Sequence, residues 1–318
     1  MRVAVVGSGG VGGLFAGLLA RAGIEVALVA RGQSLQTIQT EGLHVTSPLG
    51  DFTIRPVAAS ADPAALGRAD VVLVSVKAWQ VSEVAPKLLP LLKPDSVVIP
   101  VQNGVEAADQ LQAVLPKGSV AGGICHVQSW IDKPGHVIHV GIPPLLTLGE
   151  LSGKVSPRLE AIAEAFKRAG ITMALSSSIR ADLWEKLLFV EPLGSIGAVT
   201  RVPVDIFRSV PESRAMLVEA MQEVSRVAAA LGIQVRADAV DRSMKRVDSL
   251  PAGSIASMHR DIAEGRPSEL EQQTGAIVRF ATQTRTSASL HSWLRAALLP
   301  QELQARQKQT SAARLGSA

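Results

Sequence analysis

Residues 2–13 read RVAVVGSGGVGG, a β-branched run that stops at a cluster of glycines. From Val11 onward the apolar residues Leu14, Leu18 and Leu19 recur on one helical face, and Gly23 ends that pattern. The stretch therefore predicts a strand, a tight turn and a helix. Its turn matches GxGxxG, whose glycines allow a sharp bend, close approach of a pyrophosphate and close packing of the helix. We predict a dinucleotide-binding turn formed by Gly7, Ser8, Gly9, Gly10, Val11 and Gly12.

More buried strands are expected after this turn, at residues 25–29 (EVALV), 69–76 (ADVVLVSV) and 96–101 (SVVIPV). Runs that are apolar on both faces are typical of a parallel sheet covered by helices. Helical patterns lie between the strands at residues 81–91 and 105–115, and three additional strands are expected at 119–125, 136–140 and 145–148. The first half of the chain therefore predicts an α/β fold of the Rossmann type, with a doubly wound parallel sheet.

Beyond residue 176 the strand patterns give way to long amphipathic helices. These are expected at residues 181–191, 213–231, 237–247, 254–264, 269–283 and 290–298. This change in the spacing of apolar residues, from strand-like to helical, predicts a domain boundary near residues 174–178. We expect a nucleotide-binding domain at residues 1–175 and an all-α domain, carrying substrate-binding and catalytic residues, at residues 176–318. The polar tail after Pro300 is expected to fray.

The composition of the 318 residues excludes several classes of function. Aromatic residues make up 3% of the chain, with no tyrosine, which argues against stacking platforms for single-stranded nucleic acid. The 32 basic and 28 acidic residues are spread along the chain, so no basic patch for nucleic acid is predicted. The apolar segment 3–20 holds six glycines, unlike a signal peptide or a membrane span. Because no other stretch resembles a membrane span, we expect a protein that does not bind membranes. A single cysteine, Cys125, cannot form an internal disulfide, so we expect the protein in the cytoplasm.

The choice of dinucleotide is expected to depend on the end of the second strand. Ala30, Arg31 and Gly32 follow that strand, and no acidic residue occurs before Glu41. An NAD site usually places an acid here for the ribose 2′-hydroxyl, whereas an arginine offers a cationic fork to a 2′-phosphate. We therefore predict NADP(H) as the cofactor, with Arg31 at its 2′-phosphate. The alternative is an exposed loop arginine.

Two polar residues follow later strands, at the edge of the sheet where doubly wound folds bind ligands. Lys77 comes directly after the third strand, in VSVKAWQ (74–80), and Asn103 follows the fourth, in QNG (102–104). The lysine can reach a cofactor phosphate or ribose, and the asparagine can bridge cofactor and substrate. From these residues alone, each could equally be an ordinary turn residue.

Lys186 lies in the first predicted helix of the second domain, in RADLWEKLLF (180–189). Three apolar residues follow it, and Asp182 shares its helix face one turn earlier. Apolar neighbours can partly desolvate a lysine, which lowers the pKa of its ammonium group and makes it a usable proton donor near neutral pH. The commoner fate of such a lysine is an exposed surface position.

Taken in order, these segments resemble the ketopantoate reductase (2-dehydropantoate 2-reductase) family over nearly the whole chain. The matching segments are GSGGVGG (7–13), ARG (30–32), VSVKAWQ (74–80), QNG (102–104), residues 122–141 ending in PGHVIHVG, DLWEKL (182–187) and IASMHRDIAEGRPSELE (255–271). The resemblance implies an NADPH-dependent reductase with a Rossmann domain, a helical domain and an active site in the cleft between them. It implies reduction of the 2-oxo acid ketopantoate to pantoate, a step of pantothenate biosynthesis.

The resemblance also implies roles for single residues. Lys186 is the general acid, Ser257 contacts the substrate, and Glu269 is a catalytic residue close to cofactor and substrate. Asn103 and Lys77 match cleft residues of the family, which implies that Asn103 contacts substrate and cofactor and that Lys77 contacts the cofactor. No metal is implied. The long apolar helices of the second domain are compatible with a homodimer.

The chain departs from the family in the helix that carries the lysine. Typical members have asparagines four and eight residues after the lysine, where this chain has Val190 and Gly194. Pro192 is expected to end or kink the helix. A substrate hydroxyl would lose a hydrogen-bond partner here, so a paralogous reductase of a 2-oxo acid with a more apolar tail is an alternative. A second alternative is an NADPH-binding sensor that has lost turnover.

Other polar residues are interpreted as structural. His136 and His139 lie three residues apart in a predicted strand, which places them on opposite faces and argues against a shared metal ion. Cys125 is interpreted as a buried strand residue. The arginines of the C-terminal helices, such as Arg226, Arg236 and Arg246, are interpreted as parts of solvated faces.

Overall fold

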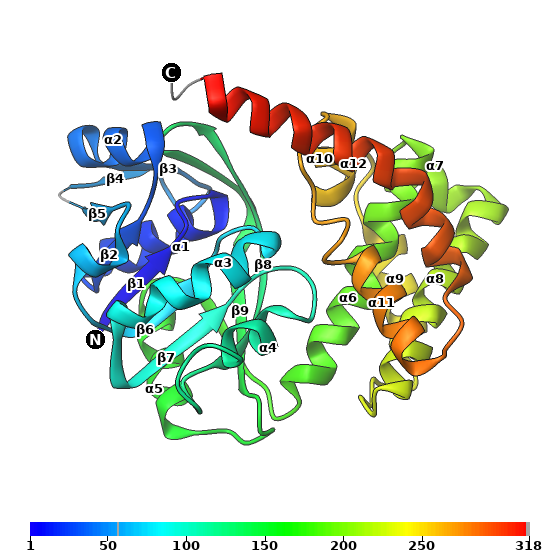
Figure 1. Cartoon of the computed structure of the whole chain (residues 1–318), viewed down its shortest axis with the longest axis horizontal. Coiled ribbons are helices and arrows are strands. Elements are labelled where there is room, and N and C mark those ends of the chain that lie inside the picture. The colour runs from blue at the N-terminus through cyan, green and yellow to red at the C-terminus, as the bar shows by residue number, and fades with distance from the viewer. Residues whose placement is uncertain (56, 316–318) are drawn as a thin grey trace. The chain divides into compact units, whose positions relative to one another are not determined.

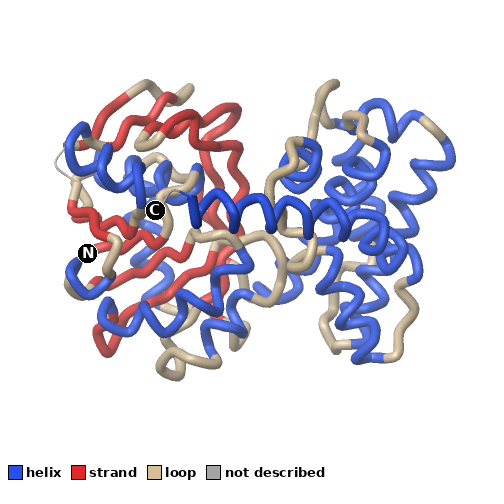
Figure 2. Tube along the Cα trace, turned by 45° about the horizontal axis from the view of Figure 1, so that its top comes forward, coloured by secondary structure: helices blue, strands red, loops and turns tan. Residues whose placement is uncertain are grey.

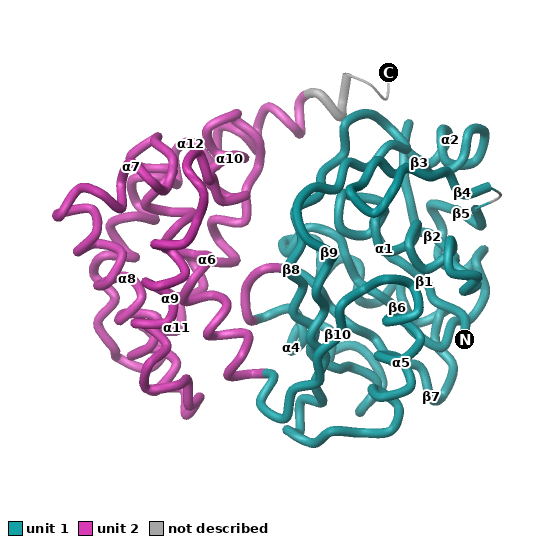
Figure 3. Tube along the Cα trace, turned by 180° about the vertical axis from the view of Figure 1, so that it is seen from behind, with its two compact units in different colours: residues 1–102, 106–179 teal, residues 103–105, 180–318 magenta. Residues whose placement is uncertain are grey.

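A computed structural model of the chain describes residues 1–55 and 57–315, with side chains as far as residue 311 (Figure 1). The chain folds into two compact units, residues 1–102 with 106–179 and residues 103–105 with 180–318 (Figure 3). Within the described residues, the named strands all belong to the first unit, and the second unit consists of helices and their connections (Figure 2). The predicted order, a Rossmann-type α/β domain followed by a helical domain, is confirmed.

The first sheet contains five parallel strands in the order β5-β2-β1-β6-β7. Its strands are β1 (Arg2–Val6), β2 (Glu25–Val29), β5 (Ala58–Ser60), β6 (Ala69–Val74) and β7 (Leu92–Pro100). Along β1, Val3 and Val5 pack into one buried apolar cluster, whereas Ala4 and Val6 pack into another. Both faces of the strand are therefore covered, which explains its continuous apolar sequence.

A second sheet is built around a long antiparallel hairpin of β8 (Ala121–Lys133) and β9 (His136–Glu150). The three short strands expected in this region are thus two long ones, joined at a turn where Gly135 has a φ of +73°. β9 also pairs with β3 (Leu43–Thr46) and β10 (Thr172–Leu175), and β3 pairs with β4 (Phe52–Ile54). Strands of three or four residues carry too little periodic signal to be predicted from sequence.

The first unit contains five α-helices and three short 3-10 helices within its described residues. They are α1 (Gly10–Arg21), α2 (Gly32–Glu41), η1 (Pro63–Leu66), η2 (Ala78–Gln80), α3 (Val81–Val84), η3 (Ala85–Leu91), α4 (Ala107–Gln112) and α5 (Pro157–Arg168). The single helix expected at residues 81–91 is therefore α3 followed by η3. Pro86 and Pro90 account for the change, because neither has the N–H that the interior of an α-helix requires.

The helices of the second unit are α6 (Ile179–Thr200), α7 (Val204–Ser209), α8 (Pro211–Ala230), α9 (Ala239–Ser249), α10 (Ser257–Ala263), α11 (Thr274–Thr284) and α12 (Ser289–Leu315). Apart from α7, each overlaps a helix expected from the sequence. Among the described residues, no helix is both long enough and apolar enough to cross a membrane.

Two proline-containing helices of the second unit are longer than expected. α6 does not end at Pro192, which was one of the two outcomes expected there, and α12 runs through Pro300 to Leu315, so the expectation that the tail frays after Pro300 is wrong for the described residues. A proline in a helix interior costs about 3 kcal/mol, so contacts elsewhere must hold both helices. Directly before Pro192, the fully buried Glu191 is bonded to other helices, and beyond Pro300 the buried Glu302 is bonded to the segment before α11.

Candidate active site

The glycine turn connects β1 to α1 at the carboxyl end of the first sheet. Gly7 has a φ of +107°, which favours glycine, and a Cβ there would lie 2.9 Å from the backbone nitrogen of Val76. A Cβ at Gly12 would collide with the carbonyl oxygen of Gly7 and with Ser75 Oγ. Glycine is therefore required at Gly7 for the bend and at Gly12 for the close packing of α1 on the strand ends.

Gly9 has the opposite environment, because a Cβ there would meet no atom within 4 Å. It is the N-cap residue of α1, where backbone N–H groups lack helical partners and the helix dipole favours an anion. An open position without a side chain at a helix N-terminus fits a pyrophosphate. The three glycines of the motif thus have the three environments that a dinucleotide turn needs, and the residues present fit such a cofactor.

Lys77 lies at the same edge of the sheet, because it follows β6, which pairs with β1. It is exposed, and its ammonium lies 5.7 Å from the centre of the Trp79 ring. Two residues not singled out from the sequence fix the chain here. Ser75 Oγ donates to the carbonyl oxygens of Val6 and Gly7 at 3.0 and 2.9 Å, and buried Gln102 Nε2 donates to two carbonyl oxygens around the end of β6 at 2.8 and 2.9 Å. A polar residue just after a buried strand is the signal that could have identified both.

Arg31 follows β2, the other neighbour of β1, and is the N-cap residue of α2. Its side chain is exposed, so it is accessible to a ligand at this edge. The fold also brings Glu83, which is distant in the sequence, near enough for its carboxylate to interact with the charge of Arg31. The hydrogen bond from Lys87, at 2.6 Å, is the main reason why the pKa of Glu83 lies below its usual value, and the charge of Arg31 contributes least. Glu83 is therefore paired mainly with Lys87 and only weakly affected by Arg31.

In the second unit, Lys186 lies in the first half of α6 and is half-buried. The next three residues, 187–189, are buried, and half-buried Asp182 lies one turn earlier. Trp184 is buried against Phe280 of α11, with ring centroids 5.6 Å apart. This packing fixes the turn of α6 that carries the lysine.

Asn103 and Glu269 are far apart in the chain but meet in the second unit. Asn103 Nδ2 donates to Glu269 Oε2 over 3.4 Å, and the same oxygen accepts from Gln273 Nε2 at 3.3 Å. Gly104 allows this approach, because it has a φ of +100° and a Cβ there would lie 2.8 Å from the carbonyl oxygen of Gln272. Glu269 itself is buried. The structure therefore brings together two of the predicted site residues.

The part of α12 beyond Pro300 anchors the segment that carries Glu269. Glu302 Oε2 accepts from the backbone N and from Oγ of Ser268, at 2.9 and 2.6 Å. Arg306 pairs with Glu302 at 2.6 Å and donates to the carbonyl oxygen of Ser268 at 3.0 Å. The sequence interpretation missed this role because the polar tail has no clear apolar stripe. The spacing of Glu302 and Arg306, four residues apart, was the available signal.

Ser257 begins α10 and is exposed, while Met258 beside it is buried. A Cβ at Gly194 would lie 2.7 Å from Met258 Cε and 3.2 Å from Met258 Cβ. The start of α10 therefore packs directly on the second half of α6. Met258 also shares an apolar cluster with Leu270, the neighbour of Glu269. These contacts place Ser257 and Glu269 on segments that pack together.

One of the three arginines interpreted as solvated has a more specific contact. Arg226 forms an exposed ion pair with Glu219 at 2.7 Å, and Arg236 is exposed. The guanidinium of Arg246, by contrast, stacks 4.1 Å from the centre of the Phe189 ring on α6, and burial lowers its pKa. Arg246 is nonetheless exposed, so the interpretation as part of a solvated face agrees with the structure, and the contact with Phe189 is an additional feature.

The two histidines of the HxxH spacing have separate partners. His139 is buried, with Nδ1 2.8 Å from Ser47 Oγ and Nε2 3.0 Å from the carbonyl oxygen of Ile142. His136 Nε2 lies 3.0 Å from Thr46 Oγ1. Cys125 is buried in β8, as interpreted from the sequence. Within the described residues, no group of three or more His, Cys, Asp or Glu could hold a metal ion.

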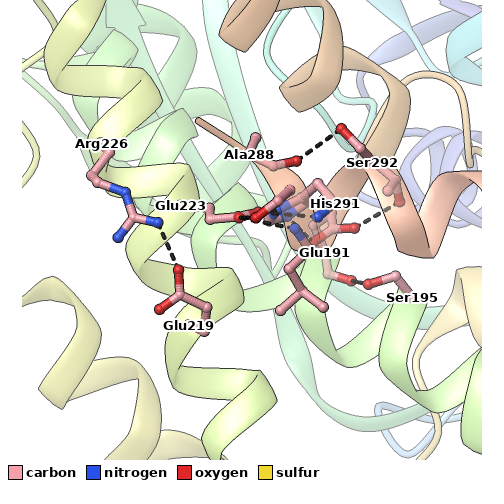
Figure 4. A network of polar contacts seen from close by, with 11 residues as sticks. Glu191, Ser195, Glu219, Glu223, Arg226, Ala288, His291 and Ser292 are labelled. Carbon is pink, nitrogen blue, oxygen red and sulfur yellow. Dashed lines mark hydrogen bonds and ion pairs between the residues drawn. The ribbon is translucent and has the colours of Figure 1, made fainter. Parts of the chain in front are cut away.

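A buried ionic network in the second unit was not predicted (Figure 4). His291 of α12 lies between two glutamates, with Nε2 2.8 Å from Glu191 of α6 and Nδ1 2.6 Å from Glu223 of α8. Thr274 of α11 donates to Glu191 at 2.6 Å. Burial alone would lower the pKa of His291, but the charge of Glu191 and the hydrogen bonds to both carboxylates outweigh it and raise the pKa to about 9. The network links four helices, including the one that carries Lys186.

Comparison with known proteins places these features in a family. The family model "Ketopantoate reductase PanE/ApbA" matches residues 3–153, and the model of its C-terminal part matches residues 178–301. A 2-dehydropantoate 2-reductase of Archaeoglobus fulgidus is 31% identical over 284 residues, which cover 87% of this chain and 90% of that protein. A crystal structure of a PanE/ApbA family ketopantoate reductase from Ralstonia eutropha superposes with a TM-score of 0.87 at 31% identity, covering 96% of this chain and 100% of that one.

A more distant structure shares the fold. The ternary structure of D-mandelate dehydrogenase with NADH and anilino(oxo)acetate has a TM-score of 0.87 at 19% identity, and the match covers 95% of this chain and 98% of that one. The family models together span most of both units, and the relatives match over nearly their whole length. This chain therefore belongs to the ketopantoate reductase family of oxidoreductases.

Proposed function

We propose that this protein reduces a 2-oxo acid to a 2-hydroxy acid with NADPH, and that ketopantoate is the first substrate to test. The observation that carries the proposal is the half-buried Lys186, followed in the chain by three buried apolar residues, in a protein whose other unit has a turn that fits a dinucleotide. Family membership supports the same reaction, since relatives such as the Archaeoglobus fulgidus protein are named 2-dehydropantoate 2-reductases.

Bound NADPH supplies the hydride that attacks the 2-oxo carbon. As the carbonyl π bond breaks and negative charge develops on its oxygen, Lys186 donates a proton from Nζ, so that the product is the 2-hydroxy acid. Asn103 and Ser257 orient the carboxylate or the carbonyl by hydrogen bonds. Glu269 holds the Asn103 amide and is the candidate partner of the lysine or of the cofactor ribose. The protein thus supplies placement and charge stabilisation.

Cofactor binding is proposed for residues at the edge of the first sheet. Gly7, Ser8, Gly9, Gly10, Val11 and Gly12 bind the pyrophosphate, Lys77 binds a phosphate or ribose, and Asn103 bridges cofactor and substrate. Arg31 binds the 2′-phosphate, which makes NADPH the preferred cofactor. The distant D-mandelate dehydrogenase structure contains NADH, so this preference needs its own test.

Replacing Arg31 with alanine is expected to weaken NADPH binding about 10- to 100-fold, because a charged hydrogen bond to phosphate contributes about 1.5–3 kcal/mol. NADH binding should change far less, because NADH has no 2′-phosphate. Titration of the purified protein with each cofactor, followed by nicotinamide fluorescence, gives both Kd values. Arg21→Ala, at the far end of α1, is the matched control for loss of an exposed arginine. Equal losses for both cofactors would remove Arg31 from the 2′-phosphate site.

The reaction itself is tested by mixing the protein with NADPH and a panel of 2-oxo acids that includes ketopantoate. Loss of the reduced-nicotinamide absorbance is expected with at least one acid. Turnover of other acids without ketopantoate would identify a paralogous reductase. Binding of NADPH without consumption on any acid would instead support the sensor alternative. A cytoplasmic location and a homodimer remain predictions.

A further inference from the structure

We infer that Glu302 of α12 is a positioning residue for Glu269, and that it acts through Ser268. This inference rests on the proposed reaction, in which Glu269 holds the Asn103 amide. It extends the set of residues on which the reaction depends to the part of α12 beyond Pro300, which lies more than 30 positions from Glu269 in the chain.

The carboxylate of Glu302 is buried although most of the neighbouring polar residues of α12 are exposed. It is 1% exposed, and a buried carboxylate needs a cation and hydrogen-bond donors to compensate for its lost water. Arg306 Nε lies 2.6 Å from Glu302 Oε1, and Ser268 supplies the donors to the other oxygen. Well-packed apolar side chains could fill such a place without this cost. The carboxylate therefore points to a requirement for the bonds themselves.

Glu302 and Arg306 hold the backbone on both sides of Glu269. The N–H and the hydroxyl of the fully buried Ser268 donate to Glu302 Oε2 at 2.9 and 2.6 Å. The carbonyl oxygen of Ser268 accepts from Arg306 at 3.0 Å, and its Oγ accepts from the N–H of Leu270 at 3.2 Å. The peptide group before Glu269 and the peptide group after it are therefore both bonded to this cluster.

The side-chain bonds of Glu269 are longer than the bonds of this anchor. Glu269 Oε2 accepts from Asn103 at 3.4 Å and from Gln273 at 3.3 Å, beyond the usual range of about 2.7–3.2 Å for N–H···O bonds. A shift of only about 0.2 Å away from Asn103 would end that bond, because a contact of about 3.6 Å is no longer a hydrogen bond. The shorter bonds between Ser268 and Glu302 therefore decide whether the contact with Asn103 forms.

The amide of Asn103 is the group that this anchor orients for the reaction. Its bond to Glu269 uses one N–H, and an amide has a second N–H and a carbonyl oxygen. Those groups are the ones proposed to bind substrate and cofactor. Because a misplacement of about 1 Å can lower a rate about 100-fold, loss of the Glu302 anchor should lower the rate as well as the stability.

A cycle of single and double substitutions in the full chain tests the inference. Glu302→Gln keeps the shape of the side chain and removes its charge, and should lower kcat/KM for the accepted 2-oxo acid about 10- to 100-fold. In a Glu269→Ala background the same change should lower kcat/KM less than about twofold, because the group that Glu302 positions is already absent. An equal factor in the two backgrounds would overturn the inference.

Glu223→Gln is the matched control for the loss of a buried carboxylate. Glu223 is also 1% exposed and also accepts backbone N–H groups in the second unit. A loss of kcat/KM that this change causes through lower stability should have the same factor with and without Glu269→Ala. If the Glu223 cycle is as non-additive as the Glu302 cycle, the coupling reflects general destabilisation and the inference fails.

Ser268→Ala is a milder second variant, which supplies the cycle if Glu302→Gln does not fold. It removes the hydroxyl that bonds Glu302 and Leu270 and keeps the backbone N–H bond. We expect kcat/KM to fall about 3- to 10-fold, in line with the loss of one hydrogen bond, and this loss should disappear in the Glu269→Ala background. The same factor in both backgrounds would exclude a route through Ser268.

The Kd for NADPH separates failure of this inference from failure of the proposed reaction. Absence of turnover by the unmodified protein with every acid in the panel would refute the reaction. The same cycles are then read from the Kd for NADPH, since Asn103 is also proposed to bind the cofactor. We expect the substitutions at residues 302 and 269 to be non-additive in that Kd, and additive effects would overturn the inference.

Discussion

Lys186→Ala is expected to lower kcat for reduction of the 2-oxo acid about 10²- to 10⁴-fold, the range that a positioned general acid contributes. The alkoxide that develops during hydride transfer would lack its proton donor, whereas the glycine turn, Arg31 and Lys77, which are proposed to bind the phosphates of NADPH, lie in the first unit. The Kd for NADPH should therefore stay the same. Single-turnover measurements of nicotinamide oxidation, with cofactor binding measured in parallel, separate the two effects.

Two comparisons make this result specific to the proton. Lys245→Ala removes an exposed lysine from α9 of the same unit and should leave kcat unchanged. Small primary amines added to Lys186→Ala should restore part of the rate, because they can enter the space of the missing side chain and donate a proton. If Lys186→Ala retains kcat near the unmodified value, the lysine is not the acid.

His291→Gln is expected to lower the free energy of unfolding by about 3–5 kcal/mol, the usual cost of removing one partner from a buried ion pair. The change leaves Glu191 and Glu223 buried at 0% and 1% exposure without the imidazolium between them. It also weakens the bonding of the N-terminus of α12, where Glu223 accepts the backbone N–H groups of Leu290 and His291 at 3.0 Å each. Urea unfolding of the full chain measures the loss.

The pH dependence of that loss follows from the direction of each pKa shift. The pKa of His291 is raised from 6.5 to about 9, so its contribution is complete below about pH 6.5 and disappears as the pH rises through about 9. Burial tends to raise the pKa values of Glu191 and Glu223, but the charge and hydrogen bonds of His291 lower both below 4.5. Their contribution is present above about pH 4.5 and is lost as the pH falls. The difference between the unmodified protein and His291→Gln should therefore be largest near pH 5–6.5.

A surface pair in the same region supplies the control (Figure 4). Arg226 and Glu219 form an ion pair at 2.7 Å with side chains 46% and 48% exposed. Arg226→Ala should cost no more than about 1 kcal/mol, because exposed pairs contribute little. If His291→Gln costs no more than this control, or if its effect does not change between pH 6 and pH 10, the imidazolium is not what stabilises the four helices.

Local rules account well for the first sheet and its glycine turn. Gly7, Gly9 and Gly12 could be interpreted from sequence because each meets a requirement of the backbone, namely a bend, an open approach and close packing. The parallel strands were predictable because burial on both faces leaves a continuous apolar run. The residues that directly follow these strands could be placed at one edge of the sheet, because neighbouring parallel strands end at the same edge.

The same reasoning failed where partners are distant in the chain. The sequence indicates a helix end or a kink at Pro192 and a fraying tail after Pro300, yet both helices continue, because Glu191 and Glu302 are held by residues on other segments. Helix propensity is a local quantity, and tertiary hydrogen bonds of buried charged groups can outweigh it. The long hairpin of β8 and β9 was divided into shorter strands for the related reason that its pairing is not local.

The amino-acid sequence alone therefore specified the dinucleotide turn, the parallel sheet, the helical second half and the buried apolar run that follows Lys186, since each depends on residues within one or two turns or strands. The folded chain was needed to bring Asn103 to Glu269 across 166 positions, to join His291 to Glu191 across 100, and to cover Gly194 with Met258. Hydrogen bonds and packing of this kind have no periodic signature, because they form between side chains whose separation along the chain is arbitrary.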